Sequence, residues 1–264
     1  MQAFPRYNVL GVGVTALSLT QARDTILAAR GRLRSGCVCV TGVHGVSEAQ
    51  RDSRMRAALN GAWLNVPDGM PLVWLGRAAG HRLVTRVYGP DLMLAVCDAG
   101  RAAGLTHFLY GGAPGVAGAL RERLCSRFPG LRIAGIFEPP FRPLAPAEFA
   151  SLRASVAAAR PDVIWVGLST PKQELFMAEH WRELDAAVLV GVGAAFDFLS
   201  GRKRQAPRWI RHSGFEWLFR LCQEPARLGP RYLANNPLFV ARVLLQVTGL
   251  RRYRPPPDVP PAAP

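Results

Sequence analysis

Residues 163–174 read VIWVGLSTPKQE, and this stretch decides the fold class. Its first four residues are an apolar, mostly β-branched run that ends at Gly167, which predicts a buried strand. Pro171 then predicts the first turn of a helix, because proline is favoured where a helix begins. A strand that gives way to a helix in this manner leaves backbone N–H groups unpaired at the helix N-terminus, where they favour a phosphate or another anion. Lys172 and Gln173 lie in that first turn and can reach such a ligand, although many helix starts share these features.

The same alternation of strand and helix continues along the chain to about residue 200. Apolar runs predict strands at 7–14, 37–41, 63–66, 107–110, 131–136, 162–167 and 186–191. Helical periodicity predicts helices at 19–33, 47–60, 70–77, 90–103, 114–128, 146–160 and 171–184. This alternation indicates an α/β fold in which helices cover both faces of a parallel sheet. Ligands of such sheets bind beyond the carboxyl ends of the strands, where Thr41, Gly112 and residues 167–173 fall.

After Ser200 the sequence predicts helices only, at 206–212, 215–222, 224–232 and 237–250. The proline-rich end, residues 251–264, is typical of a disordered tail. We therefore expect a core over residues 1–200, a helical appendage over residues 201–250 and a tail.

Composition is typical of a globular protein of the cytoplasm. The chain has 264 residues, 49% of them hydrophobic, which is enough for the core of one main domain. The N-terminus lacks the pattern of a signal peptide, and no apolar run reaches the ~18–20 residues of a membrane-spanning helix. The cysteines form no C-x-x-C pair and lie mostly in apolar runs, which favours reduced thiols over a disulfide framework; they are Cys37, Cys39, Cys97, Cys125 and Cys222.

The positive charge of the chain is concentrated near its C-terminus. The net charge is +15, and residues 201–254 hold twelve Arg or Lys against two acidic residues. The same segment has an apolar helical face with spacing i, i+3, i+4 and i+7, formed by Phe215, Leu218, Phe219 and Cys222. This is the composition of a basic amphipathic helix that lies on an anionic membrane surface. The alternative is a helical cap that packs on the sheet with its arginines solvated, and no nucleic-acid-binding motif accompanies the charge.

Three further residues are candidates for chemistry. Asp68 lies in a Pro-Asp-Gly turn after a short strand, where it serves either as a general base or only as the N-cap of the next helix. Arg86 precedes a Gly-Pro-Asp helix start, and it either points to the same sheet edge or is a solvated surface residue. His44, after the strand at 37–41, either binds ligand or completes a turn.

The sequence predicts neither a metal ion nor a cofactor. The histidines have no metal-ligand spacing to one another or to cysteine, and an Asp-x-Asp pair is absent. A Walker motif and a Gly-x-Ser-x-Gly elbow are also absent, and Gly11-Val12-Gly13 is an incomplete dinucleotide fingerprint. The charge of a diphosphate would then be met by helix N-termini and by Arg or Lys side chains.

Taken together, these motifs resemble the WecG/TagA/CpsF family of bacterial inverting glycosyltransferases, which extend polyprenyl-diphosphate-linked glycans. The resemblance covers roughly residues 7–250 in the family's order. It is carried by PDG at 67–69, RVYGPDLM at 86–93, YGG at 110–112, GLSTPKQE at 167–174, GVGAAFD at 191–197, APRW at 206–209, EWLFRL at 216–221 and QEP at 223–225.

The resemblance implies a Rossmann-like core that binds a UDP-sugar without metal, and an appendage that meets the lipid-diphosphate acceptor at the cytoplasmic membrane face. It implies that Asp68 is the catalytic base and that Thr41, Arg86 and Gln173 are active-site residues. We add Gly112, Gly167 and the other helix-start residues to the expected donor site, which then consists of Thr41, His44, Arg86, Gly112, Gly167, Pro171, Lys172 and Gln173. The arginines expected to face the acceptor phosphates are Arg211, Arg220 and Arg227.

The chain departs from the family pattern in two places. The family usually has an Asn in the loop after the second strand, where this chain has Thr41-Gly42-Val43-His44, so His44 is a candidate for part of that role. The family also usually carries further arginines after the Glu-Pro pair, where Ala226, Gly229 and Pro230 interrupt the run here.

The sequence thus predicts a metal-independent inverting glycosyltransferase, peripheral on the cytoplasmic membrane, that moves a hexosyl or N-acetylhexosaminyl group from a UDP-sugar to a polyprenyl-diphosphate-linked saccharide of a cell-surface polysaccharide. The rival prediction is a non-catalytic basic module that binds anionic lipid or nucleic acid through residues 201–254. An enzyme of the same fold with a soluble acceptor is a third reading, and a homo-oligomer is left open.

Overall fold

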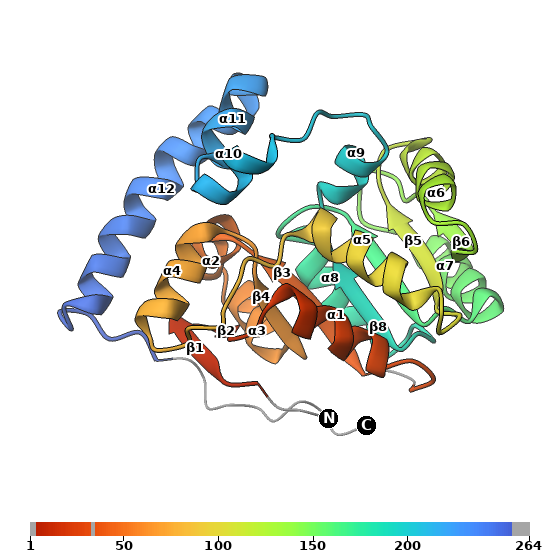
Figure 1. Ribbon diagram of the computed structural model, residues 1–264, viewed down its shortest axis with the longest axis horizontal. Helices are drawn as coiled ribbons and strands as arrows, with labels where there is room; N and C mark the ends of the chain where they lie inside the picture. The colour runs from red at the N-terminus through yellow and green to blue at the C-terminus, as the bar shows by residue number, and fades with distance from the viewer. Residues whose placement is uncertain (1–3, 33–34, 255–264) are drawn as a thin grey trace.

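A computed structural model of the chain describes residues 4–32 and 35–254, whose arrangement is shown in Figure 1. A six-stranded sheet forms the centre of the molecule. Its strands are β3 (Gly36–Thr41), β4 (Leu64–Pro67), β5 (Thr106–Gly111), β6 (Arg132–Phe137), β7 (Val163–Gly167) and β8 (Val188–Gly191). They lie in the order β4-β3-β8-β7-β5-β6, and every neighbouring pair is parallel. The predicted α/β fold with a parallel sheet is therefore confirmed.

Helices cover both faces of this sheet and enclose two hydrophobic cores. The first core includes side chains of α1 (Leu19–Ala28), α5 (Gly89–Gly100), α6 (Val116–Arg127) and α9 (Ala195–Leu199). The second includes side chains of α2 (Val43–Ala49), α3 (Ser53–Gly61), α4 (Met70–Ala78), α7 (Pro146–Ala159) and α8 (Lys172–His180). Within β3, Val38 and Val40 enter the first core while Cys37 and Cys39 enter the second. Because such strands are buried on both faces, they read in the sequence as continuous apolar runs.

The strand predicted at residues 7–14 is wrong. This segment forms an antiparallel hairpin of β1 (Arg6–Val9) and β2 (Val12–Thr15), in a two-stranded sheet of its own. The chain turns through Leu10 and Gly11, whose φ angles are 53° and 82°. Glycine adopts such positive φ angles readily, so Gly11 permits the tight turn. β2 is buried along its whole length, whereas Arg6 and Asn8 of β1 are only partly buried. The turn and the buried residues on both sides of it are apolar, so the hairpin has the sequence pattern of one longer strand.

Three predicted helices also differ from the structure, and one of them, predicted at 171–184, ends at His180 as α8. The helix predicted at 47–60 is divided into α2 and α3, because Asp52 caps the start of α3. The Asp52 carboxylate accepts a hydrogen bond of 2.8 Å from the backbone N–H of Arg54. The helix predicted at 19–33 ends at Ala28, earlier than the periodicity indicates.

Beyond the sheet, the chain continues as α10 (Arg208–Ser213), α11 (Glu216–Gln223) and α12 (Pro225–Val247). The helices predicted at 224–232 and 237–250 are in fact one helix, which contains Pro230 and Pro237. A proline inside a helix removes one backbone hydrogen bond but does not always end the helix. In Figure 1, α12 runs along one side of the molecule, where it packs against α2.

The C-terminal end of α12 is held by the β1–β2 turn. The Gln246 side-chain oxygen accepts a hydrogen bond from the Leu10 N–H at 2.8 Å, and its amide nitrogen donates to the Asn8 carbonyl at 2.9 Å. The Asn8 side chain in turn donates to the carbonyl of Tyr253. Residues 251–254 of the predicted tail therefore lie against the hairpin, and residues 255–264 lie outside the described part of the chain. None of the described helices combines the length and the apolar character needed to cross a membrane.

Candidate active site

Most of the predicted site residues lie at the carboxyl edge of the parallel sheet. The strand order reverses between β3 and β8 and again between β5 and β7, and ligands of open α/β sheets bind at such reversals. Thr41 ends β3, Asp68 directly follows β4, Gly112 directly follows β5 and Gly167 ends β7. The fold therefore brings residues that are far apart in sequence to one edge.

Two helices begin side by side at this edge. The N-caps of α2 and α4 are Gly42 and Gly69, and neither helix start is capped by a side chain. The two glycines are close together, because a Cβ on Gly42 would lie 3.9 Å from the backbone nitrogen of Gly69. Since Gly69 is the N-cap, the reading of Asp68 as the cap of α4 is wrong. At the start of α4, Pro71 has no N–H and the Leu72 N–H donates to the Gly69 carbonyl, so among the described residues the N–H groups next to Asp68 that favour an anion come mostly from the start of α2.

Arg86 is the centre of the polar contacts around Asp68. Its guanidinium donates to the Asp68 carboxylate at 3.3 Å and also to the Asp68 backbone carbonyl. A further N–H donates to the carbonyl of Arg211 at 2.8 Å, and Glu216 of α11 forms an ion pair with it at 2.7 Å. The guanidinium also stacks over the ring of Tyr88, 4.2 Å from the centroid. With only 11% of its side chain exposed, Arg86 is not the solvated surface residue of the alternative prediction.

The surroundings of Asp68 change its acidity. Burial raises the pKa of the Asp68 carboxyl to about 6, and the negative charge of Glu216 adds to this effect. The positive charges of Arg86 and Arg220 act in the opposite direction and lower this pKa. A carboxylate with a pKa near 6 is a stronger proton acceptor than an ordinary aspartate, and most of it is still ionised at neutral pH. Asp68 therefore has the properties of a general base.

Arg211 joins α10 to the same edge of the sheet. Its guanidinium donates to the Asp91 carboxylate of α5 at 2.9 Å, and it lies 5.6 Å from the centroid of the Tyr88 ring. Burial raises the pKa of the Tyr88 phenol, so this ring is neutral at physiological pH. In the described structure Arg211 thus binds a carboxylate of the chain itself, and its contact with an acceptor phosphate stays a prediction.

The other two predicted appendage arginines are less defined. Arg220 of α11 is half-buried, its guanidinium lies 5.7 Å from the ring centroid of Phe198, and its charge acts on Asp68. The side chain of Arg227 lies outside the part of the structure that is described.

Thr41 and His44 have different surroundings from each other. Thr41 is buried, its hydroxyl donates to the Asn65 side chain, and its carbonyl accepts a hydrogen bond of 2.8 Å from the N–H of Asp68. Thr41 therefore fixes the backbone of Asp68 through this hydrogen bond. His44 lies in the first turn of α2 rather than in a loop turn, with its ring nitrogen 3.5 Å from the Asn235 amide and 3.7 Å from Glu48.

Gln173 lies at the start of α8, between the ends of β7 and β8. Its side chain is buried, and its amide nitrogen donates to Glu174 at 3.0 Å. Its amide oxygen has no hydrogen-bond partner among the described residues and lies near Gly193, where a Cβ would come within 3.3 Å. Pro171 is the N-cap of α8, and the neighbouring Lys172 is exposed. A buried amide oxygen without a partner is a candidate for contact with a ligand.

The glycines of the site bring the backbones close together. A Cβ on Gly111 would lie 2.6 Å from the carbonyl oxygen of Gly167, so a larger residue would force β5 and β7 apart. The N–H of Gly112 donates to that same carbonyl at 3.1 Å. At the start of α6, the Glu138 carboxylate accepts two hydrogen bonds of 2.9 Å from Gly115 and Ala117, so this helix start already has an anion of the chain.

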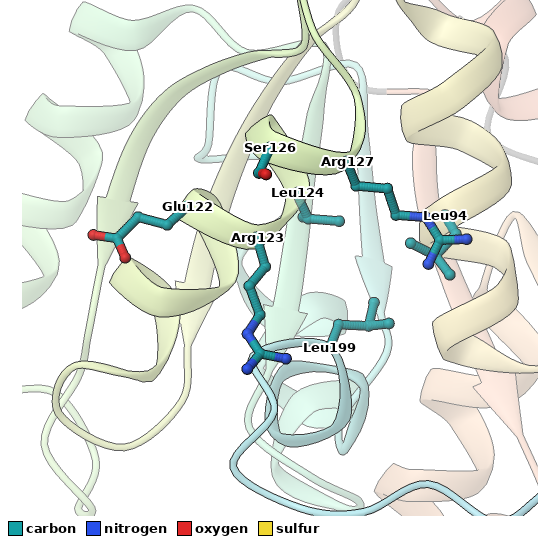
Figure 2. Close-up of a pocket in the computed structure, with 7 residues that line it drawn as sticks. All are labelled: Leu94, Glu122, Arg123, Leu124, Ser126, Arg127 and Leu199. Carbon is teal, nitrogen blue, oxygen red and sulfur yellow. The ribbon is translucent and has the colours of Figure 1, made fainter.

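A cleft beside α6 lies away from the predicted site residues. Figure 2 shows side chains of α6, among them Arg123 and Arg127, around a cleft of about 490 Å³ that Leu94 of α5 and Leu199 also line. None of the predicted site residues lines this cleft. The described residues also contain no group of three or more His, Cys, Asp or Glu that could hold a metal ion.

Sequence reasoning missed three residues of the site, namely Tyr88, Asp91 and Glu216. All three lie within the family motifs at 86–93 and 216–221, so their position was available as a signal. Their partners were not, because Glu216 and Arg86 are 130 positions apart in the chain.

Comparison with known proteins shows the family to which this chain is related. The model described as "Glycosyl transferase WecG/TagA/CpsF family" matches residues 7–253. An N-acetylglucosaminyldiphosphoundecaprenol N-acetyl-beta-D-mannosaminyltransferase of Bacillus spizizenii is 32% identical over 197 residues, which is 75% of this chain and 74% of the relative. The protein of the same description in Bacillus subtilis is 27% identical over 193 residues, 73% of each chain.

Proposed function

Because this chain belongs to the WecG/TagA/CpsF family of glycosyltransferases, we propose that it transfers a sugar from a UDP-sugar to a polyprenyl-diphosphate-linked saccharide, with inversion at the anomeric carbon. The observation that carries the proposal is the position of Asp68. This carboxylate lies beside the starts of α2 and α4, which no described side chain caps, and Arg86 holds it in place. A base and an anion-binding region are thus neighbours at the sheet edge where ligands of this fold bind.

In the proposed reaction, Asp68 removes a proton from a hydroxyl of the acceptor sugar. The resulting oxygen attacks the anomeric carbon of the donor from the side opposite the diphosphate, and the bond to UDP breaks. The raised pKa of the Asp68 carboxyl suits this step, because a stronger base accepts the proton more readily. Thr41 supports the base through its backbone carbonyl.

The charge of the UDP leaving group is met by backbone N–H groups and polar side chains, without a metal ion. The starts of α2 and α4 and the exposed Lys172 offer positive charge or N–H donors at the carboxyl edge. His44 and the amide oxygen of Gln173, which has no partner in the described part of the chain, offer further contacts to the donor, as do the backbones near Gly112, Gly167 and Pro171.

The acceptor reaches this site from a membrane surface. Exposed apolar side chains gather on the C-terminal helices, and those on α10 and around α11 are Trp209, Phe215, Trp217 and Leu218. Together with the basic residues of the segment, they suit peripheral binding to the anionic cytoplasmic face of a membrane. We propose that residues 201–250 form this membrane-associating appendage and that Arg220 and Arg227 face the acceptor phosphates. In this proposal Arg211 also contacts an acceptor phosphate, after its hydrogen bond to the Asp91 carboxylate is broken.

The relatives suggest which substrates to test first. They are described as N-acetylmannosaminyltransferases that act on N-acetylglucosaminyl-diphospho-undecaprenol. We propose that this chain uses a similar N-acetylhexosaminyl or hexosyl donor and a similar lipid-linked acceptor.

The test is a transfer assay with the purified full chain, UDP-N-acetylhexosamines and N-acetylglucosaminyl-diphospho-undecaprenol in anionic vesicles. Removal of a general base commonly slows a reaction by about 10²–10⁴-fold, so Asp68→Asn should lose nearly all turnover. The matched control is Asp24→Asn, since Asp24 is an exposed aspartate on α1. A folded Asp68→Asn protein with full turnover contradicts the proposed role of Asp68.

Membership of a glycosyltransferase family argues against the rival reading as a non-catalytic basic module for lipid or nucleic acid. The two readings differ in the response to nucleotide. The rival predicts that UDP does not stabilise the chain and that binding to lipid or nucleic acid accounts for its whole function.

A further inference from the structure

A groove between α3 and α8 forms another cavity of the molecule. It lies on the face of the sheet that α3 and α8 cover, opposite the face covered by α5. Its volume is about 650 Å³. Small residues of the two helices leave this space open, among them Ala57, Ala58 and Gly61 of α3 and Ala178 of α8. Trp63 and Trp181 also line it, although the side chain of Trp63 packs in the first core.

The inner end of the groove carries a buried carboxyl group. Glu174 of α8 lines the groove and has only 2% of its surface exposed. Its Oε1 atom accepts hydrogen bonds from the Thr170 hydroxyl at 2.8 Å and from the Gln173 amide at 3.0 Å. Its Oε2 atom has no hydrogen-bond partner among the described residues, and no described basic side chain forms an ion pair with it. A second buried polar atom without a partner in the described chain, the Ser35 hydroxyl, lines the same groove.

Such atoms are uncommon in folded proteins, because a buried polar atom without a partner is destabilising. A carboxylate in an apolar setting is stabilised best by a cation that also donates hydrogen bonds.

The two arginines that line the groove, Arg54 and Arg182, do not make an anion the better occupant. Arg54 is held by Asp52, with two side-chain contacts of 3.1 and 3.4 Å. Arg182 stacks over the ring of Trp181, 4.7 Å from the centroid. Glu179, whose side chain is 73% exposed, adds a negative charge to the lining.

We propose that the groove between α3 and α8 binds a small organic ammonium compound, whose apolar part lies between the two helices and whose ammonium group donates to Oε2 of Glu174. The site is separate from Asp68 and does not depend on the proposed transfer reaction. It is nevertheless connected to the carboxyl edge of the sheet, because Glu174 holds the amide of Gln173. An occupant of the groove therefore contacts the residue that positions Gln173.

The test uses the full chain with benzylamine and with benzyl alcohol, which has nearly the same shape but no charge at neutral pH. Ligand-observed NMR titration measures the affinity of each probe. A charge-assisted hydrogen bond to Glu174 should make benzylamine bind at least about tenfold more tightly than benzyl alcohol. Glu174→Gln keeps the shape of the side chain and should remove that preference.

A second variant keeps the test decisive if Glu174→Gln does not fold. Ala178 is exposed on α8 and lines the groove, so Ala178→Phe should fill the space and abolish binding of both probes. Ala157→Phe, on the exposed face of α7, is the matched control and should bind benzylamine like the unchanged chain. Equal affinity for the two probes, absence of benzylamine binding, or benzylamine binding that survives in folded Ala178→Phe would each overturn the proposal.

Discussion

Replacement of Asp68 by Asn should stabilise the protein at neutral and alkaline pH while it abolishes turnover. Burial raises the pKa of the Asp68 carboxyl from 3.8 to about 6, which means that the folded state binds a proton at this site more tightly than the unfolded state. The contribution of Asp68 to stability is therefore fully present below pH ~3.8 and is lost as the pH rises through ~6. Asn is neutral at every pH and avoids this loss.

The size of the effect follows from the difference in pKa. A difference of about 2 units corresponds to about 3 kcal/mol of unfolding free energy at pH 8, which falls to about 1.6 kcal/mol at pH 5. Because 30% of the Asp68 side chain is exposed, solvent screening reduces both values, and about 1–2 kcal/mol is expected at pH 8.

Urea denaturation of the purified variant and of the unchanged chain, at pH 5 and at pH 8, measures this difference. The Asp24→Asn control should change the unfolding free energy by no more than about 0.5 kcal/mol at either pH, because its side chain is 56% exposed. The reasoning is refuted if Asp68→Asn is less stable than the unchanged chain at pH 8, or if the difference between the two is the same at both pH values.

Four further outcomes are expected. Turnover should rise with pH and reach half its maximum near pH 6, where Asp68 ionises. Glu216→Gln should move this midpoint to lower pH because Glu216 raises the pKa of Asp68, and a midpoint that does not respond contradicts the assignment of the base. UDP at about 100 times its dissociation constant should add about 2.7 kcal/mol of stability in a thermal shift assay, also with EDTA present, whereas ADP should add less; stabilisation that disappears with EDTA would show that a metal is needed. Phe215→Ser and Leu218→Ser should each weaken sedimentation with anionic vesicles by up to about 1.5–3 kcal/mol, while Phe141→Ser, in the loop between β6 and α7, should leave it unchanged. Gln246→Ala removes two hydrogen bonds to the β1–β2 turn and should increase amide hydrogen exchange in α12 by about five- to tenfold, with little change in the central sheet; unchanged exchange in α12 would show that Gln246 does not hold it.

The inner strands of the central sheet were predictable because each is buried on both faces, whereas the edge strand β6 is only partly buried. Residues such as Val163–Gly167 form uninterrupted apolar runs, and the glycines and prolines next to them give the ends to within two residues. The N-terminal hairpin was not predictable in the same way, since its turn at Leu10 and Gly11 is as apolar as its strands. The prolines of α12 misled the prediction as well, because a proline more often ends a helix than lies inside one.

For the candidate site, most of the residues could be predicted from the sequence, but the contacts between their side chains could not. Asp68 and Arg86 lie together as expected, since each directly follows or precedes an element at the same sheet edge. The pairing of Arg211 with Asp91 depends on where α10 packs, and the packing of a helix 120 residues away has no local signal. Likewise, the Gly112 N–H already donates to the Gly167 carbonyl, and this hydrogen bond could not be predicted before β5 and β7 were known to be neighbours.

The ion pairs of Arg86 also bear on how the C-terminal helices can be tested. Deletion of residues 201–264 would remove the side chains that we propose to contact the membrane, but it would also remove Glu216 and the Arg211 carbonyl from Arg86. Greater exposure of Asp68 and the loss of Glu216 both lower the pKa of the Asp68 carboxyl, and only the loss of Arg220 opposes them. A truncated chain would therefore have a weaker base as well as a weaker membrane contact. Loss of turnover after truncation cannot by itself be assigned to the membrane, whereas Phe215→Ser and Leu218→Ser leave the contacts of Arg86 in place and separate the two roles.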